Sequence, residues 1–461
     1  MSWVAENEEE KGGGVLSPRR MIGRIVSFSS GAEMEGGTKT PSSDSKEYRL
    51  KPEEELRLEV AEGKSDSVKL ELAQGMAEIF GTELVCGNSY SFGPGSKLAV
   101  FTWHGCTLSI KGTPEMAYVA RDTPMIIYLN THAGVETLRK RAEKAEKRGP
   151  VVMLAGPVDV GKSTVTRILL NYATRMGRSP LYVDLDVGQS GFGIPGTIGA
   201  SLVEQPASPD GEFANKAPLL YHYGSSNMGA NPKFFKELCR VMADAVQKRL
   251  DASKKVKYSG ALINTAGWVK DEGYSCLLFA VTTFNVDLII VLDQERLYNE
   301  LVRDVPPSVH VVYQPKSAGV VERSKRTRFA SRMSRLRNYF YGNFESTYFP
   351  HTFDVKFSDL RIFKIGAPVV PKSCLPIGMT NEDAEMKLVQ VAPSKELLNH
   401  MLSLSHATVD DEKTISTNIR GFIYVTNVDV ERQTVTILSP QPRPLPDGVL
   451  LWSDVRFIDA N

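Results

Sequence analysis

The chain has 461 residues, and its 55 Lys and Arg residues nearly balance its 54 Asp and Glu residues. The formal net charge of +1 gives no overall attraction to nucleic acid or to a membrane, so any surface that binds a polyanion has to be local. With 42% hydrophobic and 24% charged residues, the composition is that of a soluble globular protein and excludes a wholly disordered or fibrous chain. The length predicts roughly two to four domains.

The cysteines and the N-terminus indicate the compartment. The five cysteines are widely separated, and none has the Cys-x-x-Cys or Cys/His spacing of a zinc site. An odd number of cysteines fits a reducing compartment with buried thiols. The longest apolar run, residues 287–293, is far shorter than the roughly 18 residues of a membrane span, and the first residues lack the basic start and apolar core of a signal peptide. We therefore expect a cytosolic or nuclear protein with no membrane partner.

The first part of the chain divides into a tail and a strand-rich segment. Residues 1–46 are rich in Gly, Ser and Thr and have few groups that bury apolar area, which predicts a disordered extension. In residues 47–133, apolar residues alternate with polar ones, for example at Ala99, Phe101 and Trp103, and Gly, Asn and Pro bound each alternating run. This segment is expected to form a small antiparallel β-sandwich with one face of each strand buried.

A connector and an α/β domain are expected next. Residues 134–149 carry opposite charges at helical spacing and predict a connector helix. Residues 150–348 alternate apolar strands with helices, and Asn231 followed by Pro232 is typical of the start of a long helix. Strands separated by helices favour a doubly wound parallel sheet.

The last part of the chain returns to strands. In residues 349–461, the strand pattern predicts a hairpin across residues 421–438, and proline-rich loops follow near residues 440–446. The expected fold class is therefore α/β: a doubly wound parallel sheet flanked by an N-terminal β-sandwich and a C-terminal β-rich domain. No internal repeat is apparent.

The strongest motif is GPVDVGKST, from Gly156 to Thr164, which matches the P-loop pattern G-x-x-x-x-G-K-[ST]. Its glycines let successive backbone N–H groups point at one anion. Lys162 would reach the β- and γ-phosphates, and Ser163 would offer its hydroxyl to Mg²⁺. The motif lies between a buried strand and a helix whose positive dipole end faces the phosphates. No [N/T]KxD element follows a strand, which argues against a GTPase but leaves kinases and motors open.

Two carboxylates, Asp184 and Asp186, end the strand that follows the first helix of this domain. A carboxylate at the C-terminal end of a strand beside the P-loop strand faces the ligand crevice. There it can hold Mg²⁺ through water or accept a proton from an attacking hydroxyl, which suits a kinase. The alternative is an aspartate that only caps the turn before Gly188.

A basic segment covers residues 316–342, in which eight Lys or Arg residues accompany one acid before Tyr339. Late in a P-loop domain, such a segment resembles a lid whose arginines stabilise the charge of the transferring phosphoryl group. It would equally suit a nucleic-acid backbone, or form a solvated basic helix.

A tryptophan follows another strand, in the loop from Asn264 to Tyr274. An exposed Trp268 would stack on a nucleobase, which contributes ~1–3 kcal/mol. The alternative is an indole packed into the core.

These motifs occur in order with several further ones, and together they resemble a known family. The chain is similar to the polynucleotide 5′-hydroxyl kinase family, whose best-known member is the ATP-binding subunit of the pre-mRNA 3′-end cleavage factor and, in animals, a partner of the tRNA-splicing endonuclease. The resemblance covers about residues 47–461. The further matching motifs are GMAEIFGTEL from Gly75, FTWHG from Phe101, DVGQ from Asp186, VLDQERLYNEL from Val291 and VVERS from Val320.

The resemblance implies transfer of the γ-phosphoryl group of ATP to the 5′-hydroxyl of RNA, with Mg²⁺, in pre-mRNA cleavage and polyadenylation and in tRNA splicing. It implies a nuclear protein whose partners are RNA with a 5′-OH end, subunits of the pre-mRNA cleavage factor complex and the tRNA-splicing endonuclease. The residues implied in catalysis are Lys162, Asp186, Arg323 and Arg328. Those implied in ATP binding are Glu55, Lys97, Asp159, Val160, Gly161, Lys162, Ser163 and Thr164. Those implied in RNA binding are Trp268, Gln189 and Arg332, and the metal would be held by Ser163 and Asp186.

The sequence departs from the family pattern at a few positions. Val158 stands where the family usually has Thr, and Asp271 and Glu272 replace small residues beside Trp268. These two carboxylates would repel RNA phosphates by a modest, salt-screened amount. A second hypothesis is therefore a non-catalytic ATP-binding scaffold of the mRNA cleavage factor, stabilised by bound ATP through mass action. A generic P-loop motor is disfavoured by the single P-loop and the flanking β domains.

Overall fold

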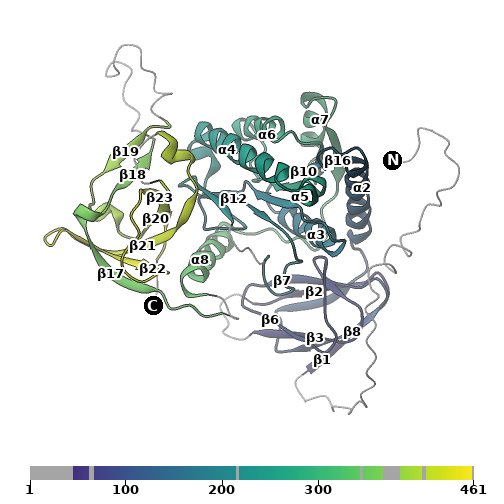
Figure 1. The fold of residues 1–461 in the computed structure, drawn as a ribbon. Coiled ribbons are helices and arrows are strands. Elements are labelled where there is room, and N and C mark those ends of the chain that lie inside the picture. Colours follow the sequence, from purple (N-terminus) through teal and green to yellow (C-terminus); the bar gives the residue numbers. More distant parts are fainter. Residues whose placement is uncertain are drawn as a thin grey trace. The chain divides into compact units, whose positions relative to one another are not determined.

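The computed structural model describes residues 45–61, 67–213, 218–342, 346–366, 385–407 and 412–458. The predicted disordered extension lies almost wholly outside these ranges. Within them the chain forms two N-terminal sheets, a central sheet with helices and a C-terminal sheet (Figure 1). The α/β class and the β-rich flanking parts expected from the sequence are confirmed.

The N-terminal part is a sandwich of two antiparallel sheets with the orders β1-β8-β3-β6 and β5-β4-β7-β2-β9. Between them lies a cluster of buried side chains that includes Leu70, Val100 and Leu108. Its strands are β1 (Ser45–Leu50), β2 (Glu55–Glu59), β3 (Val68–Gly75), β4 (Glu78–Ile79), β5 (Thr82–Glu83), β6 (Ser89–Phe92), β7 (Lys97–Phe101), β8 (Cys106–Lys111) and β9 (Met116–Ala120).

Strand β7 corrects one expectation about this sandwich. Its side chains that enter the sandwich core are Leu98 and Val100, whereas the alternating set Ala99, Phe101 and Trp103 lies on the other face. Phe101 and Trp103 belong to the hydrophobic cluster that contains the P-loop strand and its helix. Both faces of β7 are apolar, because the strand lies between two cores, so alternation could not identify the inner face.

The helix predicted at residues 134–149 is instead α2 (Met125–Lys144), which begins and ends earlier. Its buried residues include Met125, Tyr128, His132 and Val135, at helical spacing. The β-branched and aromatic start of this helix resembles a strand in local propensity, and packing against α3 overrides that preference. The expected division between residues 133 and 134 therefore falls inside a single helix.

The central sheet has the strand order β13-β12-β11-β14-β10-β15-β16. Strands β11, β14, β10, β15 and β16 are parallel, as expected, and β12 and β13 extend the sheet in antiparallel fashion. The strands are β10 (Val151–Ala155), β11 (Leu181–Asp184), β12 (Thr197–Leu202), β13 (Leu219–His222), β14 (Ala261–Asn264), β15 (Leu288–Leu292) and β16 (His310–Gln314). The helices are α3 (Lys162–Arg175), α4 (Pro232–Asp251), α5 (Lys254–Ser259), α6 (Glu272–Thr283), α7 (Glu295–Asp304) and α8 (Lys325–Tyr341).

Helices cover both faces of this sheet (Figure 1). Along β10, Val151 and Met153 pack in the cluster that includes α4 and α6, whereas Val152 and Leu154 pack in the cluster that includes α2 and α3. Burial on both faces explains the continuous apolar run of β10. The predicted start of α4 is confirmed, because the Asn231 side chain accepts a hydrogen bond from the Phe234 backbone N–H at 3.0 Å.

The C-terminal part is one seven-stranded sheet with the order β17-β22-β21-β20-β23-β18-β19. The predicted hairpin is confirmed as the antiparallel pair β21 and β22. The strands are β17 (His351–Lys356), β18 (Ile362–Ile365), β19 (Leu388–Val391), β20 (His400–Ser405), β21 (Ile419–Asp429), β22 (Thr434–Ser439) and β23 (Leu450–Arg456). Its 3₁₀ helices are η2 (Phe357–Asp359), η4 (Lys395–Leu397) and η5 (Glu412–Ser416), and a further one, η1 (Met228–Ala230), precedes α4 in the central part.

The basic helix α8 is anchored by an apolar edge. Leu336 and Phe340 are fully buried and pack with Phe422 and Tyr424 of β21. The helix is therefore not wholly solvated, and its N-terminal turns lie at the cavity described below.

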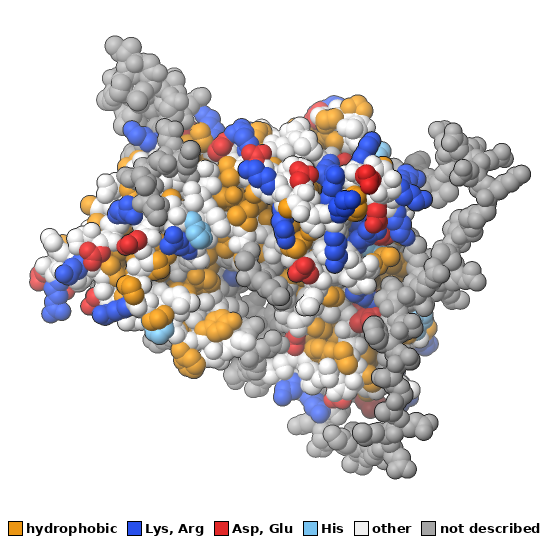
Figure 2. Space-filling model, in the orientation of Figure 1, with side chains coloured by type: hydrophobic (Ala, Val, Ile, Leu, Met, Phe, Trp, Pro, Cys, Tyr) orange, Lys and Arg blue, Asp and Glu red, His pale blue; other side chains and the backbone are white. Residues whose placement is uncertain are grey.

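The surface carries charges of both signs, as expected from the nearly equal numbers of basic and acidic residues. Figure 2 shows acidic and basic side chains interspersed over the face drawn, including the region of α2 and α5. None of the helices in the described ranges combines the length and apolar character needed to cross a bilayer.

Candidate active site

A cavity of about 630 Å³ lies at the carboxyl end of the parallel strands. Its walls come from the N-terminal sandwich, the P-loop, the loop after β11, the loop after β14 and the segment that leads into α8. A crevice at this edge of an open α/β sheet is where such folds bind ligands. Every site residue implied by the resemblance lines it: Glu55, Lys97, Asp159, Val160, Gly161, Lys162, Ser163, Thr164, Asp186, Gln189, Trp268, Arg323, Arg328 and Arg332.

The P-loop folds tightly between β10 and α3. Gly161, with φ of 91°, is the residue before the first turn of α3, and a Cβ at Gly156 would lie 2.7 Å from the Leu292 carbonyl oxygen. The Lys162 ammonium donates to the carbonyl oxygens of Gly156 at 2.8 Å and Pro157 at 2.6 Å. Burial lowers the pKa of Lys162 to about 8, although the Asp186 and Asp159 carboxylates oppose this shift. The cation is therefore held in the loop with little solvation.

Asp186 lies beyond the end of β11, because the strand ends at Asp184 rather than at the predicted Asp186. Its Oδ1 accepts hydrogen bonds from the backbone N–H groups of Gly188 at 2.9 Å and Gln189 at 3.3 Å. Asp186 thus caps the turn before Gly188, as one alternative predicted, and it also lines the cavity with Lys162. Burial raises its pKa, and the two hydrogen bonds and Lys162 limit the rise.

Asp159 joins the P-loop to the basic segment. Its carboxylate accepts from the Arg323 backbone N–H at 2.9 Å, from Arg323 Nε at 3.0 Å and from Arg328 Nη2 at 2.9 Å. Burial alone would raise the pKa of Asp159, but the hydrogen bonds from Arg323 and Arg328 lower it. The expected lid arginines therefore lie beside the P-loop, with the side chains of Arg328 and Arg323 28% and 39% exposed.

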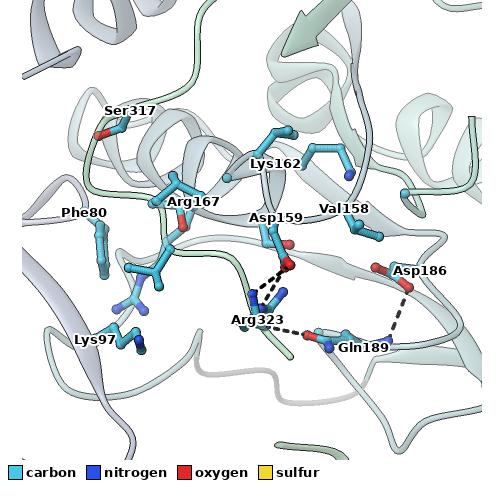
Figure 3. Close-up of a pocket in the computed structure, with 18 of the residues that line it drawn as sticks. Phe80, Lys97, Val158, Asp159, Lys162, Arg167, Asp186, Gln189, Ser317 and Arg323 are labelled. Carbon is cyan, nitrogen blue, oxygen red and sulfur yellow. Dashed lines mark hydrogen bonds and ion pairs between the residues drawn. The ribbon is translucent and has the colours of Figure 1, made fainter. Parts of the chain in front are cut away.

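The same basic segment contacts the loop that carries Asp186. Arg323 Nη1 donates to Gln189 Oε1 at 2.9 Å, and Arg332 Nε donates to the Gly188 carbonyl oxygen at 3.0 Å. Figure 3 shows the resulting chain of interactions from Asp159 through Arg323 and Gln189 to Asp186. The residues expected at RNA, Gln189 and Arg332, thus lie on the Asp186 side of the cavity.

The opposite side of the cavity is built by the N-terminal sandwich. Figure 3 places Phe80, Lys97 and Arg167 on the side of the P-loop away from Asp186. Lys97 Nζ pairs with Glu59 at 2.6 Å across the β2–β7 ladder. Glu55 is 4% exposed, and its carboxylate accepts from Arg57 and Thr123, which lie outside the P-loop domain.

Trp268 lies between the core of the central sheet and the cavity. It is half-buried and packs against the core cluster of the central sheet, yet it also lines the cavity. Two glycines leave the room that this arrangement needs. A Cβ at Gly273 would lie 2.6 Å from the indole ring, and a Cβ at Gly267 would lie 2.6 Å from the Val158 backbone nitrogen. The indole is therefore fixed in place directly beside the P-loop.

The residues present fit Mg²⁺. The exposed Ser163 hydroxyl and the Asp186 carboxylate line one cavity, and both are oxygen ligands of the kind this ion prefers. Among the described residues there is no cluster of three or more His, Cys, Asp and Glu side chains that would form a cage by itself.

Sequence reasoning missed several residues that line the cavity. Phe80 and Arg167 face each other, with the guanidinium 5.6 Å from the ring centroid, and Arg57 lies against Gly319. Phe80 belongs to the motif that begins at Gly75, but the motif assigns it no role, and these residues come from segments that only the fold brings together. Asn264, by contrast, ends β14 beside the P-loop strand, so the reasoning about strand ends that selected Asp186 would also have selected it.

Comparisons with known proteins cover nearly all of the described chain. A family model described as mRNA cleavage and polyadenylation factor CLP1 P-loop matches residues 156–342. Models described as Pre-mRNA cleavage complex II protein Clp1 and as N-terminal beta-sandwich domain of polyadenylation factor match residues 348–459 and 49–142. The family expected from the resemblance is therefore confirmed.

Relatives in other organisms are similar over almost their whole length. A Protein CLP1 homolog of Anopheles gambiae is 54% identical over 415 residues, which cover 90% of this chain and 98% of that protein. Polyribonucleotide 5'-hydroxyl-kinase Clp1 of Rattus norvegicus is 53% identical over 414 residues, which cover 90% and 97%. A solved complex of Clp1p with Pcf11p has the same fold, with a TM-score of 0.79 at 22% identity over 91% of this chain and 99% of that chain. The chain belongs to the Clp1 family of pre-mRNA cleavage and polyadenylation proteins.

Proposed function

We propose that this protein is an ATP-dependent polyribonucleotide 5′-hydroxyl kinase that acts in pre-mRNA cleavage. The observation that carries this proposal is that Lys162, Asp186 and the arginines Arg323 and Arg328 line a single cavity. A phosphate cradle, a carboxylate and lid guanidinium groups are the parts that phosphoryl transfer to a hydroxyl requires. Relatives about 53% identical carry the name polyribonucleotide 5'-hydroxyl-kinase Clp1, which supports the same conclusion.

In the proposed reaction, the 5′-oxygen of RNA attacks the γ-phosphorus of ATP. The new O5′–P bond forms while the bond between the γ-phosphorus and the bridging oxygen breaks, and ADP leaves with that oxygen. The Asp186 carboxylate orients the 5′-hydroxyl and takes its proton. Burial raises the pKa of Asp186, which makes it a stronger proton acceptor than a fully solvated carboxylate.

The cationic groups act on the phosphates. Lys162 exchanges its bonds to the Gly156 and Pro157 carbonyls for the β- and γ-phosphate oxygens. Arg323 and Arg328, held beside the P-loop by Asp159, stabilise the charge on the transferring group. Ser163 and Asp186 are the residues that would hold Mg²⁺, which when bound would supply positive charge that neutralises the phosphates.

The two ends of the cavity suit the two substrates. The sandwich residues Glu55 and Lys97 would hold the nucleoside of ATP, while Gln189, Trp268 and Arg332 would hold the first nucleotides of RNA. The solved relative is a complex with Pcf11p, which supports a role of this chain as a subunit of a pre-mRNA cleavage factor. Such a role would place the protein in the nucleus, and RNA ends with a 5′-hydroxyl would include those produced in tRNA splicing by the tRNA-splicing endonuclease.

The test is transfer of a labelled γ-phosphate to a synthetic oligoribonucleotide with a 5′-hydroxyl end. Purified protein is expected to label this RNA, to label a DNA strand of the same sequence to a different extent, and to leave a 5′-phosphorylated RNA unlabelled. Lys162→Ala should abolish labelling, because the P-loop lysine contacts the transferred group. Binding of ATP without any transfer to RNA would instead support the non-catalytic scaffold.

A further inference from the structure

Asn264 occupies a position between the two halves of the active site. It ends β14, whose neighbours are the P-loop strand β10 and the strand β11. Its register partners are Leu154 on one side and Asp184 on the other. Both Asn264 and Asp184 are 1% exposed, and Asp184 lines the cavity whereas Asn264 lies beneath this lining.

The amide of Asn264 connects the P-loop to Asp184. Its Nδ2 donates to Asp184 Oδ1 at 3.0 Å and to Ser163 Oγ at 3.3 Å. The amide orientation is set by its neighbours, because the opposite orientation would place Oδ1 against a carboxylate oxygen. In the orientation observed, Asn264 Oδ1 is buried without a hydrogen-bond partner within the described chain. A buried acceptor without a hydrogen bond costs free energy. The fold bears this cost and keeps the amino group of Asn264 between Ser163 and Asp184.

Asp184 in turn holds the loop that carries Asp186. Its Oδ1 accepts from the Asp186 backbone N–H at 3.1 Å, and its Oδ2 accepts from the Gly191 N–H at 2.5 Å. The Leu185 backbone N–H donates to the Asn264 carbonyl oxygen at 3.0 Å. Both ends of the loop from residue 185 to residue 191 are therefore fixed to this buried pair.

The choice of an amide over a carboxylate has a physical reason. In P-loop NTPases an aspartate near the P-loop assists the Ser or Thr that binds Mg²⁺. A carboxylate at residue 264 would lie within hydrogen-bonding distance of Asp184, and two buried carboxylates in contact repel each other. An amide removes this repulsion and supplies the two N–H donors that join Ser163 to Asp184.

We propose that Asn264 is a positioning residue that couples the P-loop hydroxyl of Ser163 to the loop of Asp186 through the buried Asp184 carboxylate. One amide thereby sets the phosphate end of the site and the hydroxyl-acceptor end relative to each other. Ser163 Oγ accepts a hydrogen bond from Asn264 with one lone pair. This bond fixes the direction of its other lone pair, which is available to a metal ion. The part of this inference that concerns Asp186 rests on the proposed kinase function. The part that concerns Ser163 and the metal ion depends on nucleotide binding alone.

The first readout is therefore the affinity for a non-hydrolysable ATP analogue, measured by calorimetry in Mg²⁺ and in EDTA. Wild-type protein is expected to bind at least about tenfold more tightly in Mg²⁺. Asn264→Ala should reduce this ratio at least about threefold, toward the value of Ser163→Ala, while the affinity in EDTA stays within about twofold of wild type. A merely structural asparagine would change both affinities together.

The second readout separates kcat from KM in the transfer reaction. Because the amide touches neither substrate, Asn264→Ala should lower kcat at least about tenfold and change the KM of RNA by less than about threefold. Asn264→Asp keeps the size but loses the amino group, so it should lower kcat at least as much. If Asn264→Ala does not fold, this near-isosteric variant decides the question in the same two measurements.

Asn418→Ala is the matched control. Asn418 accepts a hydrogen bond from the Leu220 backbone N–H at 3.0 Å at the outer strand of the same sheet, away from the cavity. It should lower the melting temperature without changing the Mg²⁺ ratio or kcat. Equal effects of Asn264→Ala and Asn418→Ala, or a wild-type ratio and kcat in Asn264→Asp, would overturn the inference. If wild-type protein phosphorylates no RNA, the proposed function fails, and the Mg²⁺ ratio alone still decides the role of Asn264.

Discussion

The carboxylate of Asp159 and the lid residue Arg323 make two hydrogen bonds, although they are 164 residues apart in the sequence. One bond comes from the Arg323 backbone N–H and the other from its guanidinium group. Arg328 adds an ion pair to the same carboxylate at 2.9 Å. The P-loop thus holds the basic segment, and the two arginines that we propose act on the transferring phosphoryl group are assembled beside it.

Asp159→Asn should release this lid. The amide keeps an acceptor for the Arg323 backbone N–H but loses both ion pairs, so the arginines are less often in place when the phosphoryl group moves. We expect kcat to fall about 3- to 10-fold with little increase in the KM of ATP, because lid charges act mainly in the transition state. Steady-state kinetics at saturating RNA measure both constants. Asp304→Asn, at an exposed ion pair of α7, is the control and should leave both unchanged, and an unaltered kcat in Asp159→Asn would refute the role of this cluster.

Arg175→Ala should weaken the attachment of the sandwich to the P-loop domain. Arg175 Nη1 lies 2.8 Å from Glu78 Oε2, and Glu78 also accepts from the Tyr172 hydroxyl. Glu78 is 3% exposed, so removing its cation leaves a buried charge unpaired and costs about 3–5 kcal/mol. Denaturant unfolding followed by fluorescence measures this loss. Arg303→Ala, which breaks an exposed pair, should cost far less, and an equal cost for the two variants would contradict the buried linkage.

The lowered pKa of Lys162 predicts the pH dependence of ATP binding. Below a pH of about 8, Lys162 is protonated in both the free and the bound protein. Above it, the free protein loses this proton while the phosphates of bound ATP favour the charged form. Binding must then take up a proton, so the affinity should fall by up to about tenfold for each pH unit. Calorimetry between pH 7 and 9.5 in two buffers tests this, and Lys162→Met should bind weakly with a flat profile. An affinity that rises with pH in wild type would contradict the assignment.

Trp268→Ala should weaken binding of RNA but not of ATP. The indole lines the cavity together with the P-loop, where stacking on a terminal base contributes about 1–3 kcal/mol. We expect the Kd of a 5′-hydroxyl oligoribonucleotide to rise by roughly 5- to 150-fold, with a smaller rise for Trp268→Phe. Fluorescence anisotropy of labelled RNA measures this change. Gly273→Ala should act in the same direction, because its Cβ would displace the indole, and unchanged RNA affinity in both variants would remove Trp268 from the RNA site.

The elements that the sequence predicted well are those in which a local motif and burial agree. The P-loop, the Asn231 cap of α4 and the hairpin of β21 and β22 all combine a turn or cap signal with an apolar pattern. The start of α2 could not be predicted, because residues 125–133 favour a strand locally and become helical only when packed on α3. Propensity is a weak prior that tertiary contacts override.

The candidate site was predictable where a motif carries it and not where contacts between distant segments build it. Lys162, Asp186, Arg323 and Trp268 belong to recognisable patterns, and the structure brings them to one cavity. The bonds of Asp159 to Arg323, or of Asn264 to Ser163, depend on register between strands and on the path of a long segment. Such pairings leave no periodic trace in a single sequence.

The central claim is that one cavity both binds ATP and activates the 5′-hydroxyl of RNA. The most direct measurement is single-turnover transfer from ATP to a 5′-hydroxyl oligoribonucleotide by wild-type protein and by Asp186→Asn, with ATP affinity determined for both. The account predicts that Asp186→Asn lowers the transfer rate by at least about 100-fold while ATP still binds. Wild-type transfer by Asp186→Asn, or no transfer by wild-type protein that binds ATP tightly, would contradict it.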